Sequence, residues 1–198
     1  MNDGRQCHDA RFINTPTFRT GCSAIVDDSE VARYPQGLSS SPKYEPILHV
    51  VLHQPEIPPN TGNVARSCVA IGAKLWLVKP LGFEITEKRL RRAGLDYWPH
   101  LEWEIVEDWK ELTDELAETF ATGRAWFFTK TAEREYTEPS FQRRDALIFG
   151  CETRGLPGEI LAAHPEQLLR IPIRPQVRSL NLSNAAAVAM YEAVRQIG

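Results

Sequence analysis

Short apolar runs recur along the chain from residue 47 onward, and each has the length of a β-strand. They occupy residues 47–53, 75–79, 104–106, 125–129, 146–149 and 168–171. Near-continuous apolar runs are typical of strands that are buried on both faces of a parallel sheet. The pattern therefore predicts an α/β fold with a mostly parallel sheet and helices on both faces.

Longer segments with helical periodicity lie between and after these runs. They predict helices at residues 60–71, 86–93, 109–120, 157–164 and 182–197. Thr86 and Gly94 suit the two ends of the second helix, because threonine caps a helix N-terminus and glycine ends a helix. Several alanines in the last helix allow another backbone to approach closely.

The first 46 residues have a different character. They contain Pro16, Pro35, Pro42 and a run of three serines, and they show no sustained periodicity. We predict a poorly ordered N-terminal extension at residues 1–46 and one domain at residues 47–198.

Composition and charge narrow the classes of function. Acidic residues outnumber basic ones by 26 to 23, which weakens a nucleic-acid-binding hypothesis without excluding it, because a basic patch sets its own local field. The four cysteines form no CxxC pair, so no metal site is predicted. No run approaches the roughly 20 apolar residues of a membrane span. Acidic residues near the start disfavour a transit peptide, and we expect a cytoplasmic protein without membrane contact.

The first segment that suggests chemistry is residues 55–66, which follow the first strand and open a helix. Asn60 or Thr61 is expected to cap that helix, and a rigid strand-to-helix turn explains the prolines equally well. Such a turn does not explain Arg66. We expect Arg66 at the carboxyl edge of the sheet, where α/β proteins bind ligands, placed to contact a phosphate or a developing alkoxide.

The second segment is residues 150–158, directly after the strand at 146–149. Leu156 and Pro157 stand where a phosphate-binding P-loop requires lysine and serine or threonine, so triphosphate binding is rejected. No GxGxxG fingerprint occurs either. A generic glycine turn is the alternative, but Glu152 and Arg154 on either side of Thr153 favour a functional loop.

The third segment, residues 171–184, joins the last strand to the last helix. Ser179, Asn181, Ser183 and Asn184 are interleaved with leucines. A helix N-cap needs only one such polar residue. The remaining polar groups are therefore candidates for a binding site.

Basic residues cluster at Lys88, Arg89, Arg91 and Arg92, and again along residues 170–178. A solvated helix face is the usual meaning of such a run. Lys88, Arg91 and Arg92 nevertheless share one face by their spacing, which suits contact with an RNA backbone. Tyr97 and Trp98 follow closely and are candidates for stacking on unpaired bases.

These segments, in this order, resemble the motifs of the SPOUT superfamily of RNA methyltransferases, and specifically the single-domain tRNA wobble-position 2'-O-methyltransferases. The resemblance extends from about Ile47 to Gly198. It implies a SPOUT-type α/β fold with a C-terminal trefoil knot, S-adenosyl-L-methionine as cofactor, tRNA as substrate and a homodimer. It also implies 2'-O-methylation of a wobble cytidine or modified uridine, with leucine isoacceptors as expected substrates.

The resemblance also implies site residues. The expected catalytic cluster comprises Asn60, Arg66, Glu152, Ser179 and Asn181. The expected cofactor-binding residues are Phe128, Gly150, Ile171, Ser179 and Leu180. The expected tRNA contacts are Lys88, Arg89, Arg91, Arg92, Arg154 and Tyr191. Because a guanidinium stays charged at neutral pH, we interpret Arg66 as a phosphate clamp and alkoxide stabiliser rather than a base.

Two other functions stay open. The first is 2'-O-methylation at another tRNA position or in rRNA. The second is a catalytically silent RNA-binding protein with the same fold. The presence of Asn60, Arg66, Glu152 and Asn181 argues against the silent protein.

Overall fold

The structure is a computed structural model that describes residues 45–84 and 97–198. These residues belong to one unit, Pro42–Gly198. The helix expected at residues 86–93, with Lys88, Arg89, Arg91 and Arg92, lies outside the described residues, as do residues 1–44 of the expected extension.

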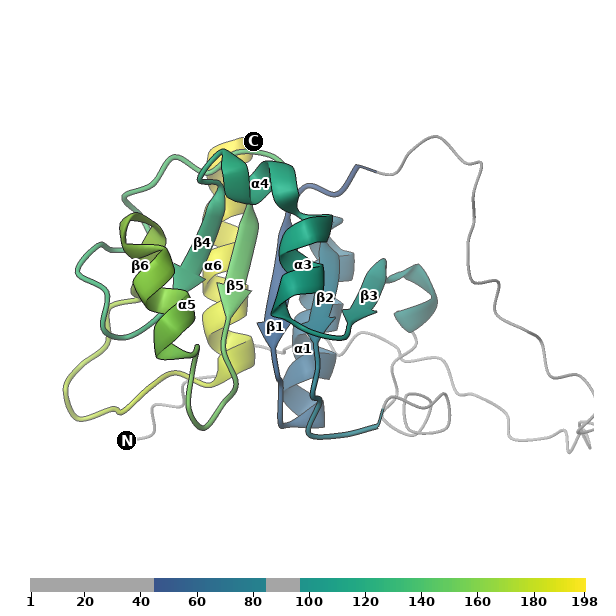
Figure 1. The fold of residues 1–198 in the computed structure, drawn as a ribbon, viewed down its shortest axis with the longest axis horizontal. Helices are drawn as coiled ribbons and strands as arrows, with labels where there is room; N and C mark the ends of the chain where they lie inside the picture. Colours follow the sequence, from purple (N-terminus) through teal and green to yellow (C-terminus); the bar gives the residue numbers. More distant parts are fainter. Residues whose placement is uncertain (1–44, 85–96) are drawn as a thin grey trace, which may run out of the picture. The chain divides into compact units, whose positions relative to one another are not determined.

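A six-stranded sheet forms the centre of the unit (Figure 1). The strands are β1 (His49–His53), β2 (Lys74–Val78), β3 (Trp103–Val106), β4 (Ala125–Phe128), β5 (Ala146–Phe149) and β6 (Leu168–Leu169). Their order is β3-β2-β1-β5-β4-β6, and all the pairings are parallel. All six predicted strands are therefore confirmed, and the sheet is parallel as predicted.

The described helices are α1 (Pro58–Ile71), α3 (Trp109–Glu115), α4 (Ala117–Ala121), α5 (Gly158–Ala163) and α6 (Leu182–Ile197), with short 3₁₀ turns at Trp98–His100 and Pro165–Gln167. The helix predicted at 109–120 is divided at Leu116, which leaves the α-helical region. Helix α1 begins two residues before the predicted start, because its first two positions are prolines, which are preorganised for a first helical turn. The prediction that Asn60 or Thr61 caps α1 was therefore wrong.

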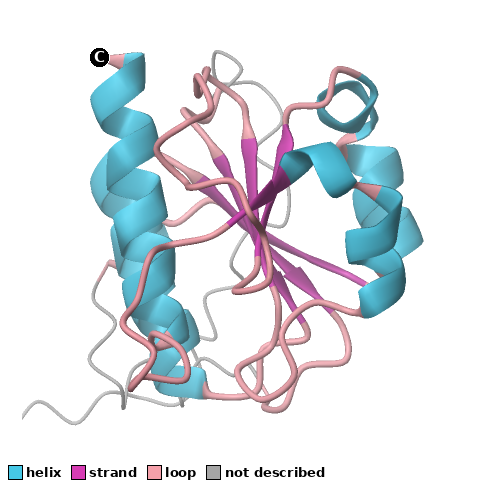
Figure 2. Cartoon of the chain, turned by 90° about the vertical axis from the view of Figure 1, so that its left-hand side faces the viewer, coloured by secondary structure: helices cyan, strands magenta, loops and turns pink. Residues whose placement is uncertain are grey.

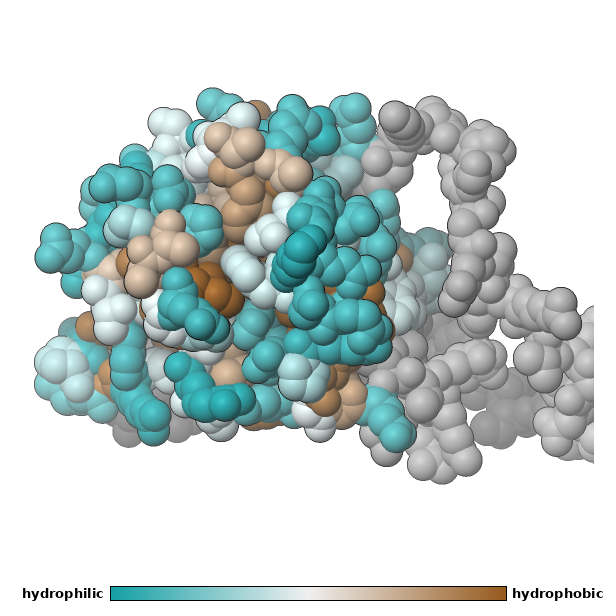
Figure 3. Space-filling model, viewed as in Figure 1, coloured by the Kyte–Doolittle hydropathy of each residue, from teal (hydrophilic) through white to brown (hydrophobic). Residues whose placement is uncertain are grey.

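Helices cover both faces of the sheet (Figure 2). On one face, α1 and α6 pack on each other and on the sheet, with Cys68 and Met190 buried against Val50 and Leu147. On the other face, Leu112 of α3 and Ile160 of α5 pack against strand residues such as Ile148. The outer surface of this second face is mostly hydrophilic (Figure 3). Strands β1 and β5 are buried at every position, which explains their largely apolar sequence, whereas the edge strand β3 exposes Glu104.

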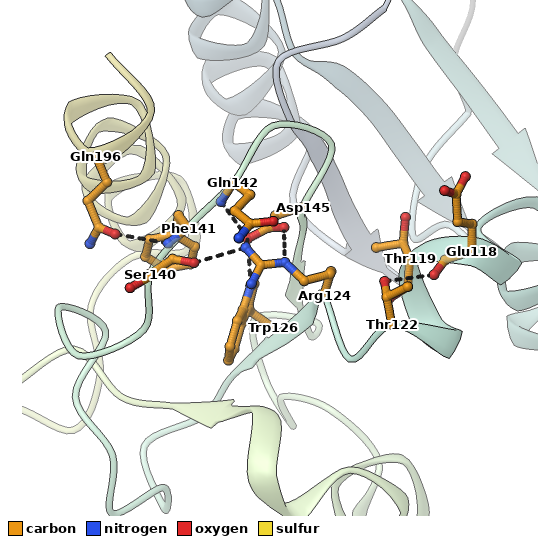
Figure 4. A network of polar contacts seen from close by, with 10 residues as sticks. All are labelled: Glu118, Thr119, Thr122, Arg124, Trp126, Ser140, Phe141, Gln142, Asp145 and Gln196. Atoms are coloured by element: carbon orange, nitrogen blue, oxygen red, sulfur yellow. Dashed lines mark hydrogen bonds and ion pairs between the residues drawn. The ribbon is translucent and has the colours of Figure 1, made fainter.

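A polar network joins the amino ends of β4 and β5 (Figure 4). The Asp145 carboxylate accepts hydrogen bonds from Nε and a terminal nitrogen of Arg124, each at 2.7 Å, and from the Trp126 indole at 2.8 Å. The backbone N–H of Gln142 donates to the same carboxylate at 3.0 Å. Although the Asp145 side chain is only 1% exposed, its charge is paired and its acceptors are occupied.

His49, at the amino end of β1, lies beside this network. Its backbone N–H donates to the carbonyl of Asp145 at 2.9 Å, and its Nδ1 accepts from the Trp76 indole at 3.1 Å. Burial, together with the nearby charges of Lys74 and Arg144, lowers the pKa of His49 to about 4. The imidazole is therefore neutral at physiological pH, and its role is a buried hydrogen bond within the core.

Candidate active site

A cavity of about 620 Å³ opens at the carboxyl ends of the strands. Its walls come from the loop after β4, the loop after β5, the segment that follows β6, and the first turn of α1. Because all the strands are parallel, their carboxyl ends meet at one edge of the sheet, where α/β folds bind ligands. The three segments that the sequence selected for chemistry all contribute to this cavity.

The loops after β1 and β5 are tied together by two glutamates. Glu152 accepts a hydrogen bond from the backbone N–H of Glu56 at 2.8 Å and from that of Ile57 at 3.2 Å. In return, Glu56 accepts from the backbone N–H of Thr153 at 3.1 Å and from its hydroxyl at 2.9 Å. This reciprocal clamp joins segments that are 95 or more residues apart in sequence.

Asn60 connects the clamp to the start of α6. Its amide nitrogen donates to Glu152 at 2.9 Å, and its carbonyl oxygen accepts from the Asn181 amide at 2.8 Å. The Asn181 oxygen caps α6 by accepting from the Ser183 backbone N–H at 2.9 Å and its hydroxyl at 2.7 Å. Asn60, Glu152 and Asn181 thus form one chain of hydrogen bonds at the wall of the cavity, as their assignment to one cluster predicted.

Gly150 is required by the fold of the loop after β5. A Cβ on Gly150 would lie 2.0 Å from the carbonyl carbon of Gly155 and 2.1 Å from the backbone nitrogen of Leu156. Gly155 itself has φ of +73°, in the left-handed region that glycine favours. The loop therefore folds back on its own backbone, which sets Cys151, Glu152 and Thr153 along the cavity.

All five residues that the resemblance assigns to the cofactor line the cavity: Phe128, Gly150, Ile171, Ser179 and Leu180. The Phe128 ring stacks on Phe149 with centroids 4.6 Å apart. Leu169 and Leu182 add apolar surface, so the cavity has an apolar wall beside the polar chain of Asn60, Glu152 and Asn181. An apolar cavity with a few fixed polar groups is the usual form of a cofactor site.

Arg66 does not reach this cavity within the chain. It is exposed on α1, is not among the lining residues, and holds its guanidinium 4.7 Å from the centre of the Tyr97 ring. The expectation that Arg66 lies at the same edge as the other site residues was therefore wrong for a single chain. Asn60 and Arg66 are six residues apart, so the helical repeat turns their side chains to different sides of α1.

Tyr97 and Trp98 do not form a free stacking surface. Both are partly buried against the core, the Tyr97 hydroxyl donates to the Gly62 carbonyl at 2.6 Å, and Trp98 packs edge-on to Trp103. These contacts leave less free ring surface than the sequence suggested, and stacking on bases stays a prediction.

Three basic residues, Lys130, Arg154 and Arg178, line the cavity, and Glu152 is the one acid that lines it among the described residues. Arg154 was expected as a tRNA contact, and it is exposed. Lys130 was missed, although it directly follows a predicted strand, where parallel sheets place functional residues. Tyr191 lies away from the cavity on α6 and is 55% exposed.

His53 ends β1 beneath the loop after β5. Its side chain is buried and packs edge-on to Trp109 with centroids 5.8 Å apart. Burial lowers its pKa, and the nearby Arg154 lowers it further. Its imidazole is therefore neutral at physiological pH, which suits a structural role in the packing around Trp109.

Within residues 45–84 and 97–198, no group of three or more histidine, cysteine, aspartate or glutamate side chains is arranged to hold a metal ion. Among the helices that the structure describes, none is both long enough and apolar enough to cross a membrane.

Known proteins share both the sequence and the fold of this unit. A tRNA (cytidine(34)-2'-O)-methyltransferase of Burkholderia cenocepacia (strain HI2424) is 47% identical over 153 residues, which cover 77% of this chain and 97% of that protein. A solved structure that gives insights into "the 2-OH methylation of C/U34 on tRNA" matches with a TM-score of 0.67 at 46% identity, covering 75% of this chain and 95% of that one. The SpoU methyltransferase AviRb of Streptomyces viridochromogenes, in complex with AdoMet, matches with a TM-score of 0.67 at 26% identity, covering 82% and 62% respectively. The SpoU rRNA Methylase family matches residues 47–191, and the chain therefore belongs to that family.

Proposed function

We propose that this chain transfers a methyl group from S-adenosyl-L-methionine to the ribose 2'-hydroxyl of nucleotide 34 of tRNA. The observation that carries the proposal is the hydrogen-bonded chain of Asn60, Glu152 and Asn181 at the wall of a cofactor-sized cavity. The match to this chain covers nearly the whole length of the relatives that are named for this reaction.

The cavity fits S-adenosyl-L-methionine. Phe128, Ile171 and Leu180 offer apolar surface for an adenine ring, and Gly150 leaves backbone groups accessible beside them. Glu152 forms no ion pair within the described residues, so its negative charge is available to a cationic ligand. When bound, S-adenosyl-L-methionine supplies an electrophilic methyl group on a sulfonium.

The residues of the chain must position and activate a weak nucleophile. Asn181 and Ser179 lie beside the cavity and are suited to orient a ribose by hydrogen bonds, and orientation supplies a large part of many rate enhancements. Arg66 keeps its charge and stabilises the alkoxide that develops as the 2'-hydroxyl loses its proton. Asn60 holds Asn181 and Glu152 in place rather than acting on the proton.

The position of Arg66 supports a homodimer. Since Arg66 does not line the cavity of its own chain, we propose that it reaches the cavity of a second copy. Val188 and Tyr191, three residues apart on α6, are 39% and 55% exposed and give this face an apolar surface for the second copy. The trefoil knot expected from the family would bring residues 150–158 and 171–184 together, and both segments line one cavity.

Mixing two defective variants tests the shared site. Arg66→Ala and Glu152→Gln, each strongly impaired alone, should recover methyl transfer when co-refolded, because a mixed dimer holds one cavity with both residues intact. Co-refolding Arg66→Ala with Asn181→Ala should give the same recovery. No recovery, in a mixture shown to contain the mixed dimer, would place Arg66 and the cavity residues in one chain.

The tRNA surface is proposed from charge and position. Arg154 at the cavity and Tyr191 on α6 are exposed, and the basic residues Lys88, Arg89, Arg91 and Arg92 complete the expected set. The substrates we propose are leucine isoacceptors with a wobble cytidine or modified uridine. A tRNA substrate also fits a cytoplasmic enzyme.

The test is methyl transfer to total tRNA. The purified protein is incubated with labelled S-adenosyl-L-methionine and tRNA, and the 2'-O-methylated nucleosides are mapped by nuclease digestion and mass spectrometry. Label at nucleotide 34 of leucine tRNAs is expected. Label at another nucleotide, or in rRNA, would change the substrate, and absence of label would favour the silent RNA-binding protein.

A further inference from the structure

The guanidinium of Arg66 lies over an aromatic ring, that of Tyr97. The guanidinium carbon lies 4.7 Å from the centre of the Tyr97 ring, which is within the range of a cation–π contact. An exposed arginine otherwise samples many rotamers, and a productive geometry would be only one of them. The ring therefore restricts the directions in which this guanidinium points.

The Tyr97 side chain is itself held in place by a hydrogen bond and by packing. The Tyr97 hydroxyl donates a hydrogen bond of 2.6 Å to the carbonyl of Gly62. Gly62 precedes Arg66 by four residues, which is about one helical turn. The rest of the ring packs against the core that α1 shares with α6. Tyr97 is thus anchored to the same helix that carries Arg66.

That helix also carries Asn60. Through Asn60, α1 is bonded to Glu152 and Asn181 at the cavity. The Tyr97 ring therefore holds the guanidinium in a defined position on α1, the rigid element that would carry Arg66 to the cavity of the second copy. Small errors in such positions cost large factors in rate.

We infer that Tyr97 is a positioning residue for methyl transfer: it holds the Arg66 guanidinium on its ring and thereby orients it for the reacting 2'-hydroxyl. This inference rests on the proposed function. A base-stacking role is disfavoured because the guanidinium covers one face of the ring and the hydroxyl is bonded to α1.

Three variants separate positioning from packing. Tyr97→Leu removes the ring, and the methyl-transfer rate at saturating tRNA and cofactor should fall about tenfold with little change in the KM for tRNA. Tyr97→Phe keeps the ring and loses the anchor, and about a threefold fall is expected. Trp98→Leu is the matched control, because Trp98 is the next residue, is also partly buried and packs on Trp103.

A second readout reports the contact without turnover. Ring current from Tyr97 should shift the Arg66 side-chain proton resonances upfield in the wild type and in Tyr97→Phe but not in Tyr97→Leu. This measurement distinguishes the inference from the proposed function, since it holds even if the protein methylates no tRNA. Three results would overturn the inference: equal rates for Tyr97→Leu and Trp98→Leu, a raised KM for tRNA alone, or resonances that Tyr97→Leu leaves unmoved.

Discussion

Two buried or half-buried carboxylates stand at opposite ends of the sheet and have different surroundings. Asp145, at the amino end of β5, is 1% exposed and is paired with Arg124. Glu152, just beyond the carboxyl end of β5, receives hydrogen bonds from two backbone amides and from Asn60, and it lines the cavity.

The difference lies in whether the charge is neutralised. Asp145 has a bidentate guanidinium partner, so its charge is paired inside the protein and serves stability. Glu152 has neutral donors only, within the described residues, so its position is fixed while its charge stays available. The amino end of the sheet thus pairs its buried charge, whereas at the carboxyl end Glu152 has no ion-pair partner among the residues that the structure describes.

Breaking the amino-end network should have the largest effect on stability. Asp145→Asn leaves the Arg124 guanidinium without its counter-ion, and the free energy of unfolding should fall by about 3–5 kcal/mol. Urea denaturation at neutral pH measures the change. The control is Asp114→Asn, which breaks the exposed ion pair with Lys110 and should leave stability unchanged within error. Equal losses for the two variants would mean that the Asp145 network contributes no more than a surface pair.

Acid should weaken the same end of the sheet through His49. An unfolded histidine binds a proton below pH 6.5, whereas folded His49 does so only near pH 4, so the unfolded state carries more protons between these values. This contribution to stability is full above pH 6.5 and falls by up to about 3 kcal/mol toward pH 4.

His49→Asn retains an acceptor for the Trp76 indole and removes the titration. Its urea unfolding, followed between pH 4 and 7, should lose the part of the pH slope that His49 causes. A slope identical to that of the wild type would show that His49 is not the responsible group.

At the carboxyl end, Glu152→Gln should reduce the rate of methyl transfer much more than it reduces stability. We expect methyl transfer to slow about a hundredfold, or about 2.7 kcal/mol, while the free energy of unfolding falls by only about 1 kcal/mol. Single-turnover kinetics and urea denaturation measure the two quantities. Glu56→Gln is the matched control, because Glu56 completes the clamp but does not line the cavity. If both variants lose the same rate, the clamp rather than the charge at the cavity explains the loss.

Local sequence predicted the elements of this fold well. Every strand was found because each one contains a short apolar run, and α6 begins where predicted because Asn181 caps it. The loop after β5 was correctly selected from its glycines and from Glu152. Two local details were wrong: the prolines that begin α1 were interpreted as a loop, and the break at Leu116 gave no sequence signal.

The sequence by itself determined the strand and helix pattern and the carboxyl-edge location of the candidate segments, and the family resemblance implied which polar residues would meet there. Only the tertiary structure decided that Glu56 and Glu152 clamp two loops together, that Arg66 stays outside its own cavity, and that Tyr97 holds it there. The reason is physical. Burial and helix capping depend on neighbouring residues in the chain, whereas these contacts join segments that only the packing of α1 against the sheet brings within hydrogen-bond or ring-contact distance.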